Sequence, residues 1–149
     1  MNKLIAIAMA GAVAAIPGVA LAEHHEEGPT IRENADYLNI VMVDIKPGKR
    51  GRAEEIIREY FRKASKAAGT PEPYLVHLQT GSWDFIVAWD MKDGPVELTY
   101  TGTPNGKKWF AALTELAGGE DEARAIQEEY SSLVARTSSM IGHHHRDEE

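Results

Sequence analysis

The chain has 149 residues, no cysteine and a formal net charge of −7 at pH 7 with neutral histidines. This length suits one domain, and the lack of cysteine excludes disulfide bonds and cysteine nucleophiles. The negative balance argues against nucleic acid as a partner, because displacing its counterions needs a basic face, and it argues equally against an anionic membrane surface.

The first 22 residues have the organisation of a secretory signal peptide. Lys3 precedes the apolar run Leu4–Ile16, and small residues at Ala20 and Ala22 supply a cleavage site. The run has 13 residues, whereas a membrane-spanning helix needs about 20. We therefore predict cleavage after Ala22 and a periplasmic or secreted protein with no membrane segment, an uncleaved anchor being the alternative. Loss of Lys3 moves the formal charge to −8.

Residues 23–36 are polar and contain Gly28 and Pro29, which is typical of a flexible leader. Residues 37–141 are predicted to form one α+β domain. Its first strand is "YLNIVMVDI", Tyr37–Ile45, which is apolar and rich in branched side chains. From Arg52 the apolar residues follow helical spacing as far as Gly69, which fits a helix stop.

Two further strands, "YLVHLQT" (Tyr74–Thr80) and "WDFIVAWDM" (Trp83–Met91), flank Gly81-Ser82. A two-residue hairpin loop there would pair His77 with Ile86. This register predicts one apolar face made of Tyr74, Val76, Leu78, Phe85, Val87 and Trp89. The other face is mixed and consists of Leu75, His77, Gln79, Asp84, Ile86 and Ala88. We expect helices on the apolar face and water, a second subunit or a ligand on the mixed face.

The pattern weakens after this hairpin. Val96–Tyr100 is a candidate short edge strand, and the next helix covers "KKWFAALTELAGG", where Thr103 or Asn105 is expected to provide the cap. A last helix runs to about Arg136, and Thr137–Ile141 is the other candidate strand. Residues 142–149 are predicted to be a His- and acid-rich tail.

The predicted order of strand, helix, strand, strand, helix, helix is a ferredoxin-like α+β plan, with helices on one face and an extra C-terminal helix. The stretches "YLNIVMVDIKPGKRGRAEEIIREYF" and "YLVHLQTGSWDFIVAWDM" resemble the dimeric α/β-barrel superfamily, which includes antibiotic-biosynthesis monooxygenase-like, EthD-like and NIPSNAP-like groups. The resemblance covers residues 37–140. It implies a homodimer with two sheets face to face, and a ligand in the barrel or between sheet and helices.

Two departures from the superfamily are visible. The fourth strand of the plan has only the two weak candidates named above. Asn39 and Trp89 invite comparison with residues of the haem-degrading members, but no histidine lies on the expected helix, so that activity is not carried over.

His77 is the candidate catalytic residue, because imidazole titrates near neutrality and can act as a general acid or base. Gln79 and Asp84 are candidates for orienting a ligand on the same face. The alternative is a histidine satisfied at a dimer interface. Trp89 and Trp109 are expected in the core; the alternative is an aromatic ligand pocket lined by Trp83, Trp89, Trp109, Tyr74 and Tyr100. The basic cluster Lys49–Arg52 is either a solvated helix start or a contact for an anionic ligand.

Both ends of the mature chain carry metal-ligand candidates. Cleavage after Ala22 would place His25 third from a free amine, a nitrogen-rich arrangement that suits Cu(II) or Ni(II), with His24 beside it. His143, His144 and His145 add donors at the other end, and Zn(II) is a further candidate ion. The alternative is two hydrated tails.

The leading hypothesis is an exported protein that binds, and in one version transforms, a small organic molecule as a homodimer. The alternatives are a metal-binding protein acting through its His-rich termini and a non-catalytic interaction module.

Overall fold

The computed structural model describes residue 30 and residues 32–146 of the chain. In chain order the elements are β1 (Ala35–Ile45), α1 (Arg50–Ile56), the π-helix η1 (Ile57–Phe61), α2 (Arg62–Ala68), β2 (Tyr74–His77), β3 (Phe85–Met91), the 3-10 helix η2 (Gly94–Thr99), α3 (Pro104–Ala117), α4 (Glu120–Leu133) and β4 (Val134–His145). The strands form one antiparallel sheet in the order β2-β3-β1-β4. This is the ferredoxin-like α+β fold that the sequence predicts. Among the described residues, no helix has both the length and the apolar character needed to cross a membrane.

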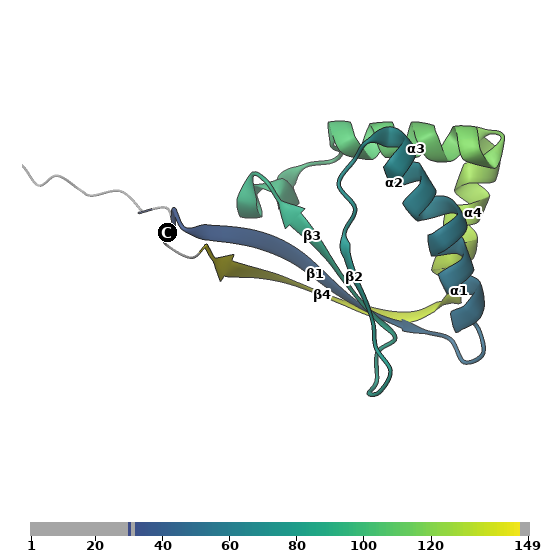
Figure 1. The fold of residues 1–149 in the computed structure, drawn as a ribbon, viewed down its shortest axis with the longest axis horizontal. Helices are drawn as coiled ribbons and strands as arrows, with labels where there is room; N and C mark the ends of the chain where they lie inside the picture. Colours follow the sequence, from purple (N-terminus) through teal and green to yellow (C-terminus); the bar gives the residue numbers. More distant parts are fainter. Residues whose placement is uncertain (1–29, 31, 147–149) are drawn as a thin grey trace, which may run out of the picture. The chain divides into compact units, whose positions relative to one another are not determined.

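The helices gather on one face of the sheet (Figure 1). The helical segments α1, η1 and α2 run without a break, and α4 packs beside α1, while α3 contacts α2 and α4. The core between sheet and helices consists of Val43, Ile45, Ala53, Ile56, Phe85 and Leu133. A second cluster, made of Ala64, Ala112, Leu113 and Ala123, joins the helices to one another.

Local signals in the sequence account for the helix ends. Gly69 adopts the left-handed conformation, with φ of 61°, directly after α2. The Thr103 hydroxyl accepts a hydrogen bond of 3.0 Å from the backbone amide of Gly106, which caps α3 as predicted. The last helix ends at Leu133, earlier than predicted, and the chain passes directly into β4.

The predicted hairpin register is wrong by one residue. His77 pairs with Phe85 and Leu75 with Val87, where the sequence predicted Ile86 opposite His77. The connection is longer than Gly81-Ser82, because the last hydrogen bond before it joins the Leu78 amide to the Asp84 carbonyl at 2.8 Å. A one-residue slip turns every side chain of a strand to the other face. The faces of β2 are therefore reversed, and His77 lies on the helix side instead of the mixed face.

The fourth strand is present and long. β4 pairs with β1 along its whole length, from Val134 opposite Ile45 to His145 opposite Ala35. Of the two candidates, Thr137–Ile141 lies in this strand, whereas Val96–Tyr100 overlaps η2. The three histidines predicted for the tail are strand residues, and the final helix precedes a strand instead of ending the domain.

The sheet face away from the helices is apolar and uncovered among the described residues. Val41 and Val43 face the core, so strand alternation turns their neighbours to this open face. The open face carries Leu38, Ile40, Met42, Tyr74, Val76, Ile86, Ala88 and Met140. Tyr74, Val76 and Met140 are 67%, 49% and 42% exposed. We predicted a mixed face here, and the register slip explains the difference.

Candidate functional site

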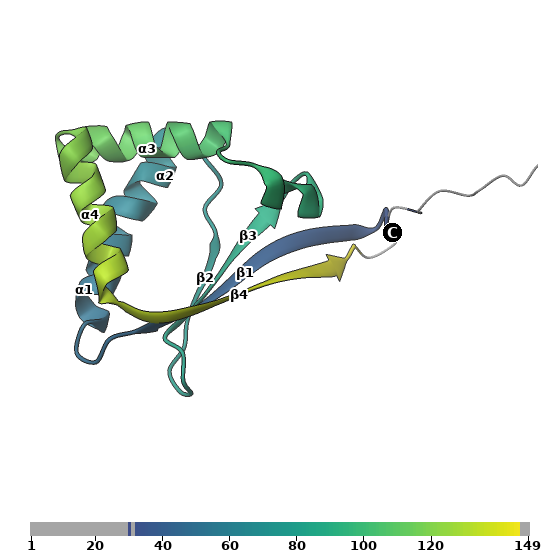
Figure 2. The ribbon, with the colours of Figure 1, turned by 180° about the vertical axis from the view of Figure 1, so that it is seen from behind.

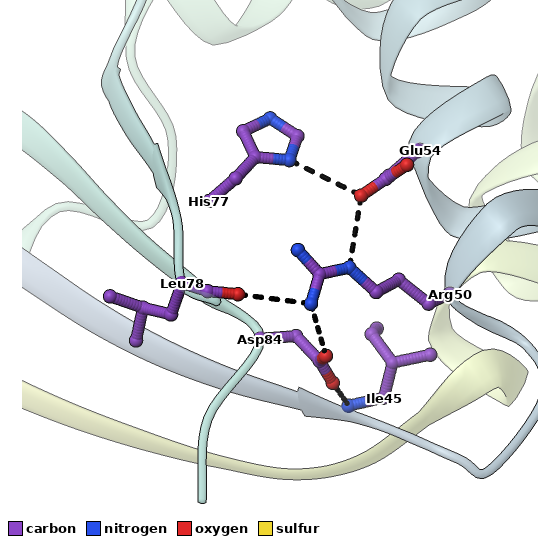
Figure 3. A network of polar contacts seen from close by, with 6 residues as sticks. All are labelled: Ile45, Arg50, Glu54, His77, Leu78 and Asp84. Carbon is purple, nitrogen blue, oxygen red and sulfur yellow. Dashed lines mark hydrogen bonds and ion pairs between the residues drawn. The ribbon is translucent and has the colours of Figure 1, made fainter. Parts of the chain in front are cut away.

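His77 belongs to a network of polar contacts between α1, β2 and the loop that precedes β3 (Figure 3). Its Nδ1 atom lies 3.3 Å from Glu54 Oε1, and the same oxygen accepts a hydrogen bond of 3.0 Å from Arg50 Nε. The His77 ring stands edge-on to Phe85, with 5.1 Å between ring centroids. A carboxylate and an aromatic ring therefore orient this imidazole.

Asp84 lies at the other end of the network and has a structural role. Its Oδ2 atom accepts a hydrogen bond of 2.8 Å from the Ile45 amide, and its Oδ1 atom accepts one of 3.1 Å from Arg50 Nη1. The same Arg50 nitrogen donates to the Leu78 carbonyl at 3.0 Å. Asp84 and Arg50 thus join the end of β1 to both sides of the hairpin loop.

The structure does not bring the three predicted site residues together. Gln79 is exposed in the loop and makes no hydrogen bond within the described part of the chain, and Asp84 reaches His77 only through Arg50 and Glu54. Sequence reasoning missed Glu54 as the partner of His77, and Arg50 as the residue that links Glu54 to Asp84. No spacing signals the pair, because Glu54 and His77 lie 23 residues apart and meet only when α1 packs beside β2.

The electrostatics of this network favour an ionised Glu54. The hydrogen bond from Arg50 lowers the pKa of Glu54, burial opposes that shift, and the contact with His77 adds to it. Glu54 is therefore a carboxylate at neutral pH and accepts from His77 Nδ1–H. The His77 side chain is 42% exposed, and its Nε2 atom has no partner among residues 32–146. Nε2 is therefore the ring nitrogen at which the predicted acid–base role of His77 would operate.

The two arginines of the basic cluster Lys49–Arg52 are held by carboxylates of the protein. Arg50 pairs with Glu54 and Asp84, and Arg52 Nε lies 2.7 Å from Glu129. These pairs favour the interpretation of a helix start over that of a contact for an anionic ligand.

A second candidate site lies on the helix side of the sheet, at the end away from α1, α2, α3 and α4, where the short helix η2 follows β3 (Figures 1 and 2). Asn39 pairs with Trp89 on β3 and with Ile141 on β4, so the three side chains form one row across the sheet. We call Trp89, Asn39 and Ile141 the uncovered row. Trp89 is 42% exposed and Ile141 is 39% exposed. The prediction of a core Trp89 is wrong.

Aromatic groups continue the uncovered row toward the chain ends. Tyr37 pairs with Met91 and with His143, whose ring centroid lies 5.6 Å from that of Tyr37. A side chain added at Gly94 of η2 would contact the Tyr37 ring at 3.5 Å, so η2 lies next to Tyr37 at this end of the sheet. The predicted core position of Trp109 is confirmed, because Trp109 packs in the helical cluster and donates to the Phe61 carbonyl at 3.2 Å.

His77 and the uncovered row are separate sites. His77 pairs with Phe85, and Trp89 lies four residues further along β3, a distance of roughly 13 Å at the rise of an antiparallel strand. Val87 stands between them in the core. One small molecule on the uncovered row would not contact His77.

The C-terminal histidines do not converge on one point. His143 and His145 share a face of β4, with ring centroids 5.2 Å apart, whereas His144 lies on the other face with its Nε2 atom 3.7 Å from Asp36 Oδ2. Within the described residues, no group of three or more His, Asp or Glu side chains is arranged to hold a metal ion. His24 and His25 lie outside the described residues.

No family model and no curated protein matches the sequence. Among solved structures, the chain is similar to a NIPSNAP family protein of Agrobacterium tumefaciens, at 15% identity over 71% of this chain and 90% of that chain, with a TM-score of 0.45. A second NIPSNAP family protein of that organism, described as having unknown function, matches at 11% identity over 77% and 93%, with a TM-score of 0.48. An uncharacterised NIPSNAP domain protein of Burkholderia xenovorans matches at 14% identity over 70% and 90%, with a TM-score of 0.38. These matches carry neither a family nor an activity to this chain.

Proposed function

We propose that this chain is an exported protein that binds a small organic molecule on the uncovered row, as a homodimer joined through the open sheet face. The observation that carries the ligand proposal is the exposure of Trp89 and Ile141 on the face of the sheet that otherwise forms the core. Large apolar side chains gathered on one exposed surface are a common mark of a binding site. Export rests on the predicted signal peptide, residues 1–22.

The chemistry of the row defines the ligand class. Trp89 offers an aromatic face for stacking, and Ile141 extends the apolar floor on the far side of Asn39. The Asn39 amide can both donate and accept hydrogen bonds. We therefore propose a flat, largely apolar molecule with at least one polar group above the centre of the row. The proposal includes no reaction.

The dimer proposal rests on the open sheet face. All of its apolar residues except Leu38 form two adjacent rows: Tyr74, Ala88, Ile40 and Met140 in the first, and Val76, Ile86 and Met42 in the second. The ion pair of Arg136 with Asp44, at 2.9 Å, borders these rows at one end, and Asp90 and Asp36 lie toward the other. An apolar centre with a charged rim is the usual anatomy of a protein interface. A second copy is a suitable occupant, because it would offer the same apolar surface.

The test of ligand binding uses N-phenyl-1-naphthylamine, a neutral aromatic probe whose fluorescence rises in apolar surroundings. We expect saturable binding by the mature chain and about a tenfold loss of affinity for Trp89→Ala, because a lost aromatic contact is worth on the order of 1.4 kcal/mol. Leu116→Ala is the matched control, since Leu116 is equally exposed, at 43%, on α3. It should bind the probe like the wild type.

Two results would overturn the ligand proposal. One is wild-type affinity in Trp89→Ala, which would place the probe elsewhere. The other is no saturable binding by the wild type, which together with a stable dimer would leave a non-catalytic interaction module as the better interpretation. Mass spectrometry of the exported chain tests the cleavage prediction, and the expected N-terminal residue is Glu23.

A further inference from the structure

The end of β4 divides three consecutive histidines into a pair and a single residue. Successive side chains of a strand point to opposite faces. His143 and His145 therefore lie together on the helix side, with ring centroids 5.2 Å apart, while His144 lies opposite Asp36 on the open side. The sequence alone does not distinguish the three histidines, whereas their positions in β4 place them on two different faces of the sheet.

We propose that His143 and His145 bind one Cu(II) ion as a two-imidazole chelate, with water at the remaining positions. Imidazole nitrogen suits Cu(II), which stands highest in affinity among the divalent first-row metals and accepts a tetragonal set of nitrogen and oxygen ligands. Metal–imidazole bonds are about 2 Å long, so the two nitrogens must approach to roughly 3 Å of each other. Rings 5.2 Å apart on one strand face can reach this separation by side-chain rotation.

The surroundings of His143 prepare it for this role. A metal ion binds imidazole through a ring nitrogen, and the rings of His143 and His145 lie side by side on one face of β4. The Tyr37 ring, 5.6 Å away, packs against His143 and limits its freedom.

Arg32 opposes metal binding. Its Nη1 atom contacts His143 Nε2, so the guanidinium occupies one ring nitrogen and places a positive charge beside the ion. A metal ion must displace Arg32 or use the other nitrogen. Arg32→Ala should therefore strengthen Cu(II) binding, a gain that damage to the fold would not produce.

The experiment is a Cu(II) titration of the mature chain that carries His24→Ala and His25→Ala, which removes the candidate amino-terminal site. Calorimetry measures the affinity, and electron paramagnetic resonance reports the number of bound nitrogens. We expect two imidazole nitrogens in this background. His143→Ala and His145→Ala should each leave one nitrogen and weaken binding by about tenfold, because the second contact of a chelate forms at high effective concentration. His144→Ala is the matched control and should change neither quantity.

The outcomes separate a chelate from an undirected His-rich tract. An equal loss of Cu(II) affinity in all three alanine variants would overturn the proposal. A single bound nitrogen in the protein that carries only His24→Ala and His25→Ala would overturn it too. Copper retained equally by all variants would place the ion at another residue and would also overturn it. Circular dichroism confirms that each variant is folded, and Trp89→Ala should leave copper binding unchanged, which keeps this test independent of the ligand proposal.

Discussion

The carboxylate of Asp84 accepts a hydrogen bond from the backbone amide of Ile45 at 2.8 Å, across 39 residues of sequence. The Asp84 amide in turn donates to the Val43 carbonyl at 2.9 Å. Asp84 therefore continues the pairing of β1 and β3 with its side chain at the point where the strands separate. Asp84, which the sequence predicted to orient a ligand, holds the hairpin loop on the sheet.

Asp84→Ala should destabilise the protein by about 1–3 kcal/mol, because it leaves the backbone amide of the buried Ile45 and the Arg50 guanidinium without this acceptor. Urea unfolding followed by circular dichroism measures the free energy of unfolding. Glu115→Ala is the control, since Glu115 is exposed on α3 and makes no contact of this kind among the described residues. An Asp84→Ala variant as stable as the control would contradict the structural role.

The contact of Glu54 with Arg50 should make stability depend on pH. Because its pKa in the folded protein lies below the ordinary value of 4.5, ionised Glu54 stabilises the folded state above about pH 4.5. This contribution is lost as the pH falls through the folded-state pKa. Wild type should therefore exceed Glu54→Gln in stability at pH 7, and the difference should shrink toward pH 3.

Urea midpoints measured across this pH range test the expectation for Glu54. Glu115→Gln is the control, because Glu115 has no partner in the described part of the chain. Its urea midpoint should stay close to that of the wild type at every pH measured. A Glu54→Gln difference that is constant with pH would show that ionisation of Glu54 does not support the fold.

Two leucines of α3 should respond very differently to truncation. Leu113 is fully buried between α2 and α4, whereas Leu116 is 43% exposed. Leu113→Ala should cost about 2–5 kcal/mol through lost burial and the cavity that remains. Leu116→Ala should change the free energy of unfolding by no more than about 0.5 kcal/mol. Similar costs for both, measured by thermal or urea unfolding, would contradict the packing of α3 against its neighbours.

A charge on the open sheet face should prevent dimer formation. Val76 and Met140 are exposed apolar residues at the two sides of this face, and burying a carboxylate there without a partner is unfavourable. Val76→Glu and Met140→Glu should each sediment as monomers in analytical ultracentrifugation while the wild type sediments as a dimer. Leu116→Glu, on the helical layer, should remain dimeric, and a monomeric wild type would refute the dimer proposal.

Sequence periodicity was sufficient for β1 and for the first helix. An unbroken apolar run predicts a buried strand, and residues at helical spacing that end in Gly69 predict a helix with its stop. These signals depend only on neighbours along the chain. The order of elements then leads to the ferredoxin-like plan, and the structure confirms it.

Local sequence signals could not predict the hairpin register. They could not predict the contacts of His77 either, because these depend on the register. The residues Gly81-Ser82 by themselves predict a two-residue turn, but contacts with distant residues stabilise a longer loop. Arg50 holds the Leu78 carbonyl, and Arg136 donates to the Ser82 carbonyl at 2.9 Å from 54 residues away. A register shift of one residue was enough to move His77 from the expected mixed face to the helix side of the sheet.

The C-terminal strand shows the same division between local and tertiary information. The segment from Thr137 to His145 is rich in Ser, Thr and His, so its composition by itself is typical of a tail. It is a strand because β1 offers hydrogen-bonding groups along its entire length. The sequence by itself determined the fold class and the first elements, since those follow from local periodicity. Only the tertiary structure decided which residues share a face, because that depends on pairing between distant segments.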